Sequence, residues 1–284
     1  MRWESGRRST NIEDRRGRGG GAVVGGGGIG LLILVLIIAF ITGANPLELL
    51  QQTDVGAPVG GSVPTGAPSA DDPQAQMVSA VLGSTEDVWR EIFAKGGSRY
   101  QDPVLVLFDG SVASACGMAS SAVGPFYCPG DHKLYLDLSF FRELAQRFGA
   151  PGEFAQAYVV AHEVGHHVQT LLGTSAQVNQ ARARASEVQS NQLSVMQELQ
   201  ADCYAGVWGN HAARKDWLEE GDVEDGLRAA AAIGDDRLQR RSQGYVAPES
   251  FTHGSAEQRQ QWLLRGLKTG DINQCDTFKA GDSE

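Results

Sequence analysis

One uncharged stretch of the chain limits where a folded domain can form. No Asp, Glu, Lys or Arg occurs between Gly19 and Leu47, and residues 29–41 read IGLLILVLIIAFI. Together with the apolar residues that precede it, this run is long enough to cross a bilayer as one helix of about 20 residues. We therefore expect a transmembrane helix over residues 22–42, with the folded part of the chain after it.

The residues before this stretch are basic, with six Arg against three acidic side chains. The positive-inside rule places such a tail, residues 1–21, in the cytoplasm and sends the following domain to the other side of the membrane. A cleaved secretory signal is the alternative, because the apolar run is short and the small residues 42–44 could form a cleavage site. Both interpretations export the domain to the cell envelope. A buried core helix does not suit the Gly-rich flanks and the basic tail.

Composition separates a linker from a domain in the remaining residues. Residues 43–75 are rich in Gly, Pro, Ser and Ala and predict a flexible linker, because they carry too few bulky side chains to form a core. Residues 76–284 predict one domain. The chain has a net charge of −10, and removing the tail's excess of three positive charges leaves −13 for the rest. Such an acidic chain argues against nucleic acid as a partner.

Hydrophobic periodicity predicts a mainly helical α+β domain. Apolar residues recur at helical spacing from Gln76 to Lys95. A short apolar run at residues 104–108 and an alternating pattern at residues 133–138 predict two strands of a small sheet. Ser139 is the expected N-cap of a helix that continues to Phe148. The rest of the sequence predicts further helices over residues 153–172, 176–208, 223–241 and 255–267.

Four cysteines, Cys116, Cys128, Cys203 and Cys275, all follow the apolar stretch. An even number of cysteines in an exported domain favours disulfide bonds. The sequence alone leaves their pairing open: Cys116 with Cys128 is the local choice, which closes a short loop and leaves Cys203 with Cys275. A zinc–thiolate cluster is the competing interpretation, but the spacing lacks the close cysteine pairs that such sites use.

The sequence HEVGHH at residues 162–167 concentrates groups that can bind a metal. On a helix, His162 and His166 project from one face one turn apart, which suits two imidazoles that bind one ion. Glu163 lies beside that face, where it can take a proton from a metal-activated water. Apolar residues before the motif predict a buried helix, and Gly165 in its interior predicts close approach of another backbone. The H-E-x-x-H pattern alone is only moderately specific, since it also arises by chance.

A catalytic zinc needs a third protein ligand and an open position for water or substrate. Downstream, the sequence ELQAD at residues 198–202 places Glu198 and Asp202 on one face of a second long helix. Glu198 can bind the metal, while Asp202 can accept the other ring N–H of a ligand histidine and fix its tautomer. A solvated acidic pair is the alternative for this spacing in isolation. Flanking apolar residues such as Leu199 and Trp208 favour a partly buried helix instead.

The blocks HEVGHH and ELQADCYAG resemble the gluzincin pattern and, more narrowly, the bacterial family of putative neutral zinc metallopeptidases. The resemblance extends to MRWESGRRSTNIEDRR at the N-terminus, the single apolar segment, the CG…YCP region and the late FTHGSAEQR. It implies a zincin-like fold with one Zn²⁺ ion. The roles it implies are those of ligands for His162, His166 and Glu198, general base for Glu163, and partner of His162 for Asp202.

The same resemblance gives roles to two later residues. His253 would stabilise the oxyanion, and Arg259 would be a structural or substrate-binding residue. A loop histidine near a helix start, with Thr252 or Ser255 as the cap, is the alternative for His253. Residues 126–138 lie where gluzincins place the edge strand that pairs with an extended substrate, although an ordinary core strand fits this sequence equally well.

These features together predict a membrane-anchored zinc peptidase that hydrolyses peptides or proteins, as an endopeptidase rather than an exopeptidase. The N-terminus would lie in the cytoplasm and the catalytic domain outside it. The alternative is a non-catalytic scaffold or binding domain that zinc only stabilises. Glu163 argues against that alternative, because a structural site needs no base. A helical binding protein with a chance H-E-x-x-H is the most distant interpretation.

Overall fold

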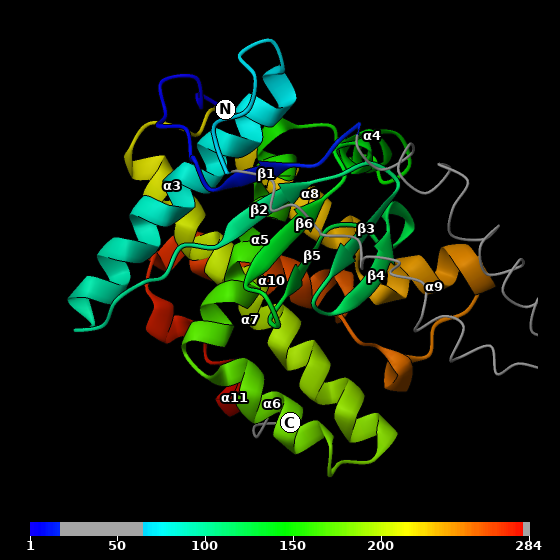
Figure 1. Ribbon diagram of the computed structural model, residues 1–284. Coiled ribbons are helices and arrows are strands. Elements are labelled where there is room, and N and C mark those ends of the chain that lie inside the picture. Colours follow the sequence, from blue (N-terminus) through cyan, green and yellow to red (C-terminus); the bar gives the residue numbers. More distant parts are fainter. Residues whose placement is uncertain (18–64, 281–284) are drawn as a thin grey trace, which may run out of the picture.

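A four-stranded sheet covers one side of the computed structural model, which describes residues 1–17 and 65–280 (Figure 1). The strand order is β1-β2-β6-β5, in which β1, β2 and β6 are parallel and β5 is antiparallel to β6. A separate antiparallel hairpin pairs β3 with β4. The strands are β1 (Ile12–Asp14), β2 (Val104–Leu107), β3 (Ser111–Ser114), β4 (Gly117–Ser120), β5 (Phe126–Cys128) and β6 (Lys133–Leu136).

Helices make up most of the described chain, so the predicted mainly helical α+β class with a small sheet is confirmed. They are α3 (Pro73–Lys95), α4 (Ser139–Gln146), α5 (Glu153–Leu171), α6 (Thr174–Arg182), α7 (Glu187–Arg214), α8 (Asp222–Ala232), α9 (Asp235–Gln243), α10 (Ala256–Thr269) and α11 (Thr277–Ala280). Short 3-10 turns lie at Ser121–Val123, Pro248–Ser250 and Ile272–Cys275. Within the described residues, no helix combines the length and the apolar character needed to cross a membrane.

Two helices that the sequence predicts as continuous are each interrupted. Residues 176–208 fall on α6 and α7 because Ser186 starts a new helix, in which its side chain and that of Gln189 cap each other's backbone N–H groups. Residues 223–241 fall on α8 and α9, which meet at Gly234. The expected cap at Ser139 is also wrong: Ser139 is the first residue of α4, and its N–H donates to the carboxylate of Asp137.

Residues 1–17 belong to the folded unit rather than to a tail outside it. Ile12 lies opposite Leu105 in the β1–β2 pair and is only 2 % exposed. The Leu105 N–H donates to the Asn11 carbonyl at 2.9 Å, and the Arg15 N–H donates to the Leu107 carbonyl at 2.8 Å. The expected domain start at residue 76 is therefore corrected for this segment. Although the segment is basic, strand pairing and the burial of Ile12 make it part of the folded domain.

The predicted transmembrane helix over residues 22–42 lies outside the described residues, and so does the linker up to residue 64. Residues 65–72 contain no helix or strand, and the Gly66 N–H donates to the Ile12 carbonyl at 2.9 Å. The first domain helix, α3, begins at Pro73, slightly earlier than predicted. Asp72 is its N-cap, with a side chain that accepts the N–H of Ala75.

Glycines let three helices approach closely in the core. A Cβ atom at Gly165 of α5 would lie 2.9 Å from the Ala201 carbonyl oxygen of α7. A Cβ atom at Gly266 of α10 would lie only 2.0 Å from the Cys203 carbonyl oxygen, also on α7. The close backbone approach predicted at Gly165 is therefore confirmed. Since α7 packs against both α5 and α10, side chains from all three helices meet in one place.

Two disulfide bonds cross-link the domain. Cys116 pairs with Cys128 beside the β3–β4 hairpin, and Cys203 of α7 pairs with Cys275 in the last 3-10 turn. All four cysteines of the chain are thereby paired. The local pairing is confirmed, and a zinc–thiolate cluster is excluded for these residues.

Candidate metal centre

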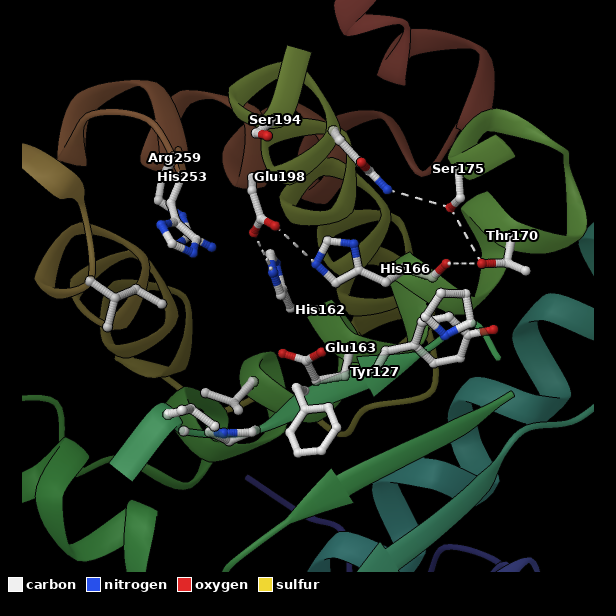
Figure 2. Close-up of a pocket in the computed structure, with 18 of the residues that line it drawn as sticks. Tyr127, His162, Glu163, His166, Thr170, Ser175, Ser194, Glu198, His253 and Arg259 are labelled. Atoms are coloured by element: carbon white, nitrogen blue, oxygen red, sulfur yellow. Dashed lines mark hydrogen bonds and ion pairs between the residues drawn. The ribbon is translucent and has the colours of Figure 1, made fainter. Parts of the chain in front are cut away.

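Three side chains from α5 and α7 converge at one pocket (Figure 2). His162 Nε2 lies 3.2 Å from one carboxylate oxygen of Glu198, and His166 Nε2 lies 3.4 Å from the other. One ligand atom from each of the three residues lies within 4.8 Å of the others. The structure thus brings together the three residues that the sequence predicts as metal ligands.

The Glu198 carboxylate lies at a suitable distance from both histidines for a shared zinc ion. Ligand atoms at about 2.0–2.2 Å from a tetrahedral zinc lie roughly 3.3–3.6 Å apart, close to the distance from each histidine to its nearer Glu198 oxygen. Among residues 1–17 and 65–280, no further His, Cys, Asp or Glu joins the group. Three protein ligands with one open position are typical of catalytic zinc, whereas structural zinc is usually closed by four protein ligands.

Asp202, fully buried on α7, orients the first histidine. Its Oδ1 accepts hydrogen bonds from His162 Nδ1 at 2.9 Å and from the Tyr158 hydroxyl at 2.6 Å. Burial by itself would raise the pKa of Asp202, but Arg259 and His162 outweigh it and lower this pKa to about 2. Asp202 therefore remains a carboxylate and holds His162 with Nε2 turned toward Glu198.

Arg259 of α10 completes this buried network. Its Nε and Nη2 donate to the two carboxylate oxygens of Asp202 at 2.8 and 2.9 Å, and Nη2 also reaches the Tyr158 hydroxyl at 3.1 Å. The residue borders the pocket but is only 2 % exposed. Of the two roles expected for Arg259, the contacts support the structural one.

His166 is oriented by a different partner. Its Nδ1 donates to the Gln169 side-chain oxygen at 2.9 Å, one turn further along α5. The Gln169 amide nitrogen in turn donates to the Gln197 carbonyl at 2.7 Å and to the Gln200 side chain at 3.1 Å, both on α7. This arrangement fixes which end of the amide faces His166, so that Nε2 is the ring atom left for Glu198.

Glu163 lines the same pocket and stands apart from the ligand set. Figure 2 shows its carboxylate directed into the pocket beside His162 and His166. Within the described chain it makes no hydrogen bond or ion pair of the kinds that hold Glu198 and Asp202. A carboxylate left free next to a metal centre is available to accept a proton.

His253 reaches the pocket from the loop before α10, and Asp235 at the start of α9 holds it there. Asp235 accepts the backbone N–H groups of Thr252, His253 and Gly254 at 2.7, 2.6 and 3.1 Å, and its other oxygen lies 3.2 Å from His253 Nδ1. This hydrogen bond is the main reason why the pKa of His253 is raised. Ser255 caps α10, as expected in the alternative that treats His253 as a loop histidine near a helix start.

The pocket has a volume of about 580 Å³ and is bordered by the sheet edge. Phe126 and Tyr127 of β5 line it, and β5 is the last strand of the sheet order. Apolar side chains from other elements extend this lining, among them Val123, Phe140, Ile233 and Leu238. Within residues 126–138, β5 lies at the edge of the sheet and β6 lies in its interior. Pairing of the edge strand with a substrate stays a prediction.

His167 links α5, the helix that carries His162 and His166, to the edge strand β5. Burial lowers the pKa of His167 to about 4, so the ring is neutral at pH 7. One ring nitrogen lies 2.6 Å from the Gln101 carbonyl and therefore donates, while the other accepts from the Tyr127 hydroxyl at 3.1 Å. His167 thus joins α5 to Tyr127 of β5 through a hydrogen bond.

Three residues of the site were not predicted from the sequence. Tyr158 and Gln169 lie on α5, four residues before His162 and three after His166, so helical spacing could have indicated them. Asp235 lies 18 residues from His253 and contacts it only through the turn before α10. Its position gives no local signal, because the pairing depends on how α9 and α10 meet.

Comparison with known proteins places this site in a family. Residues 1–278 match the family described as Putative neutral zinc metallopeptidase. The chain is 46 % identical to Uncharacterized protein YpfJ of Escherichia coli K12, over 98 % of this chain and 99 % of that protein. It is also 46 % identical to Uncharacterized protein Rv2575 of Mycobacterium tuberculosis, over 72 % of this chain and 71 % of that one. No solved structure matches the chain significantly. The chain belongs to the putative neutral zinc metallopeptidase family.

Proposed function

We propose that this protein is a zinc-dependent peptidase of the gluzincin type, with His162, His166 and Glu198 as ligands and Glu163 as the general base. One observation carries the proposal. Three ligands face a pocket, no fourth protein ligand from the described residues closes the site, and a free carboxylate lies beside them. A zinc site that served only folding would need neither the open position nor the base.

The residues divide the work of peptide hydrolysis. A zinc ion held by the three ligands would polarise the substrate carbonyl and lower the pKa of a water molecule. Glu163 then accepts the proton of the attacking water and passes it to the leaving amine. Asp202 and Gln169 keep the two imidazoles in their orientation, so that ligand geometry does not have to be re-formed in each cycle.

His253 is proposed to stabilise the oxyanion. It borders the pocket, and Asp235 favours its protonated form, which can donate a hydrogen bond to developing negative charge. The three backbone N–H groups bound to Asp235 hold the loop in place. A histidine held in this way at the border of the pocket supports a role in catalysis.

The proposed substrate is an extended peptide that adds to the β5 edge. Main-chain hydrogen bonds to an edge strand recognise peptides of many sequences, and the apolar lining from Phe126, Phe140 and Leu238 favours a bulky apolar side chain near the scissile bond. A chain bound in this way passes the metal ligands without needing a free terminus. We therefore propose endopeptidase rather than exopeptidase activity.

Substitution Glu163→Gln tests the proposal most directly. Glutamine keeps the size of the side chain but cannot take a proton, so hydrolysis of a quenched fluorescent peptide library should fall by roughly 10²–10⁴-fold. Zinc content, measured on the same purified samples, should remain one ion per chain. The matched control is Glu187→Gln, an exposed residue at the start of α7, which should hydrolyse like the parent.

Two results would contradict the proposal in different ways. A zinc-loaded Glu163→Gln protein that cleaves as fast as the parent would remove Glu163 as the base. A parent protein that binds zinc tightly but cleaves no member of the library would favour the scaffold alternative.

Work outside the cytoplasm remains a proposal from the sequence. The expected single crossing by residues 22–42 is not proposed again, because it would place residues 1–17 and the sheet that they join on opposite sides of the membrane. The two disulfide bonds support an oxidising compartment for the domain. The proposal does not include a cytoplasmic location for residues 1–17, because these residues contribute a strand to the sheet of the same domain.

A further inference from the structure

The N-terminal segment, residues 1–17, is built into the domain at buried positions. Ser9 is fully buried, and its backbone exchanges hydrogen bonds with α3: the Ser9 N–H donates to the Ser79 carbonyl and the Ser79 hydroxyl donates to the Ser9 carbonyl, both at 3.0 Å. A Cβ atom at Gly83 would lie 2.6 Å from the Arg7 carbonyl oxygen, so α3 has a glycine where this segment crosses it. The surface of α3 is thus shaped for the segment.

A buried carboxylate of α3 depends on the same segment. Glu86 is fully buried, and its carboxylate accepts hydrogen bonds from the Arg7 guanidinium at 2.6 Å, the Ser9 hydroxyl at 2.5 Å and the Asn11 amide at 2.8 Å. Removing the segment would expose this carboxylate or leave it without those donors, at a cost in free energy.

The sheet gives a second and separate set of contacts. Beyond the β1–β2 pairing, Lys133 of β6 donates to Glu13 at 2.5 Å, and Arg16 donates to Asp72, the N-cap of α3, at 2.6 Å. Without β1, strand β2 would present an unpaired edge, and Leu105 would lose Ile12 as its neighbour in the core. Two separate parts of the domain, near residues 72 and 133, are therefore tied to residues 13–16.

We infer that residues 1–17 and residues 65–280 lie on the same side of the membrane. A single crossing between residues 17 and 65 would put them on opposite sides, and the domain would then lack β1 and the donors to Glu86. The inference also holds if the strand came from a second copy of the chain, because that copy's N-terminal segment would equally have to reach the domain's side. It does not depend on the proposed peptidase activity.

Thiol labelling in cells tests this inference on the full-length protein. We would make two single-cysteine reporters at exposed positions, Ser5→Cys in the N-terminal segment and Ser242→Cys at the end of α9. Spheroplasts would be treated with a membrane-impermeant maleimide that adds mass, before and after lysis and without reductant. The parent is the control for background, because its four cysteines are paired in disulfides.

We expect both reporters to be labelled to the same extent before lysis, as the disulfides place the domain on the oxidising side. Equal protection of both until lysis would also support the inference, with both parts in the cytoplasm. Labelling of Ser242→Cys before lysis and of Ser5→Cys only after it, or the reverse, would overturn it. A cytoplasmic thiol protein that stays unlabelled until lysis verifies that the membrane was closed.

Discussion

Two buried carboxylates, Asp202 and Glu86, look alike when each is considered alone. Both are fully buried, both lie on long helices, and each accepts hydrogen bonds from an arginine and from two other side chains. The two carboxylates differ in the location of the side chains that donate to them. The partners of Asp202 include His162, which borders the pocket. Within the described chain, the side chains that donate hydrogen bonds to Glu86 come from residues 7–11, and Arg90 of α3 adds an ion pair at 3.8 Å.

This comparison shows when a buried charge indicates function. A buried ionised group must be paired wherever it occurs, so burial and pairing alone do not distinguish a site from a structural anchor. Asp202 joins side chains of α5, α7 and α10, and the hydrogen-bonded chain ends at His162, a proposed metal ligand. Glu86 connects one segment, residues 7–11, to one helix, α3.

Replacing the two carboxylates by amides should give the largest difference. Asp202→Asn leaves Arg259 buried beside a neutral group and disturbs the orientation of His162, so unfolding free energy should fall by about 3–5 kcal/mol and zinc affinity by about 10–100-fold. Glu86→Gln should lower the unfolding free energy by about 1–3 kcal/mol without changing zinc affinity. Chelator competition and urea unfolding measure the two quantities.

The comparison fails if the two variants lose zinc affinity equally. Such a result would mean that the N-terminal segment and the metal centre are coupled through the core. In that case a structural change at α3 reaches α5 or α7.

A smaller loss of unfolding free energy is expected from a change at Ser9, one of the residues that donate to Glu86. Ser9→Ala removes a buried hydroxyl that donates to Glu86 and accepts the Asn11 N–H, and it should lower the unfolding free energy by about 1–3 kcal/mol. Thr10→Ala, at the exposed neighbouring position, should change it by no more than about 0.5 kcal/mol. Equal unfolding curves for the two variants would argue that residues 1–17 do not pack in solution as described.

The smallest change, in the pH dependence of activity, is expected at a third buried carboxylate, Asp235. Its partners are backbone N–H groups of the loop, which it holds in place, and His253, which is proposed to act in catalysis. Its hydrogen bond raises the pKa of His253, so Asp235→Asn should move that pKa back down. If protonated His253 stabilises the oxyanion, kcat/KM declines as pH rises through its pKa, and in the variant this decline should begin at lower pH. Asp236→Asn is the control, because Asp236 binds the Ala256 N–H and not His253.

A pH profile of kcat/KM decides this point. An alkaline limb that stays in place in Asp235→Asn would mean that His253 does not act as a proton donor. Asp235 would then serve only to hold the loop before α10.

Local patterns predicted the parts of the site that lie on single helices. The i, i+4 spacing places His162 and His166 on one helix face and Glu198 and Asp202 on another, independently of the tertiary fold. Gly165 correctly indicated the close approach of another backbone. The same patterns failed at the two interrupted helices, because a capping box and a glycine joint outweigh a continuous run of helix formers. They also failed at Asp235, whose partner depends on how two helices meet.

The sequence by itself determined the chemistry that this protein can carry: two imidazoles one turn apart, a carboxylate beside them, a second acidic pair, and four cysteines. Helix geometry is local, so these groupings follow from spacing alone. Only the tertiary structure decided that α7 brings Glu198 to His162 and His166, that Arg259 supports Asp202 from within, and that residues 1–17 form a strand of the domain. Those contacts join residues far apart in the chain, and they depend on which surfaces pack closely enough to bury them.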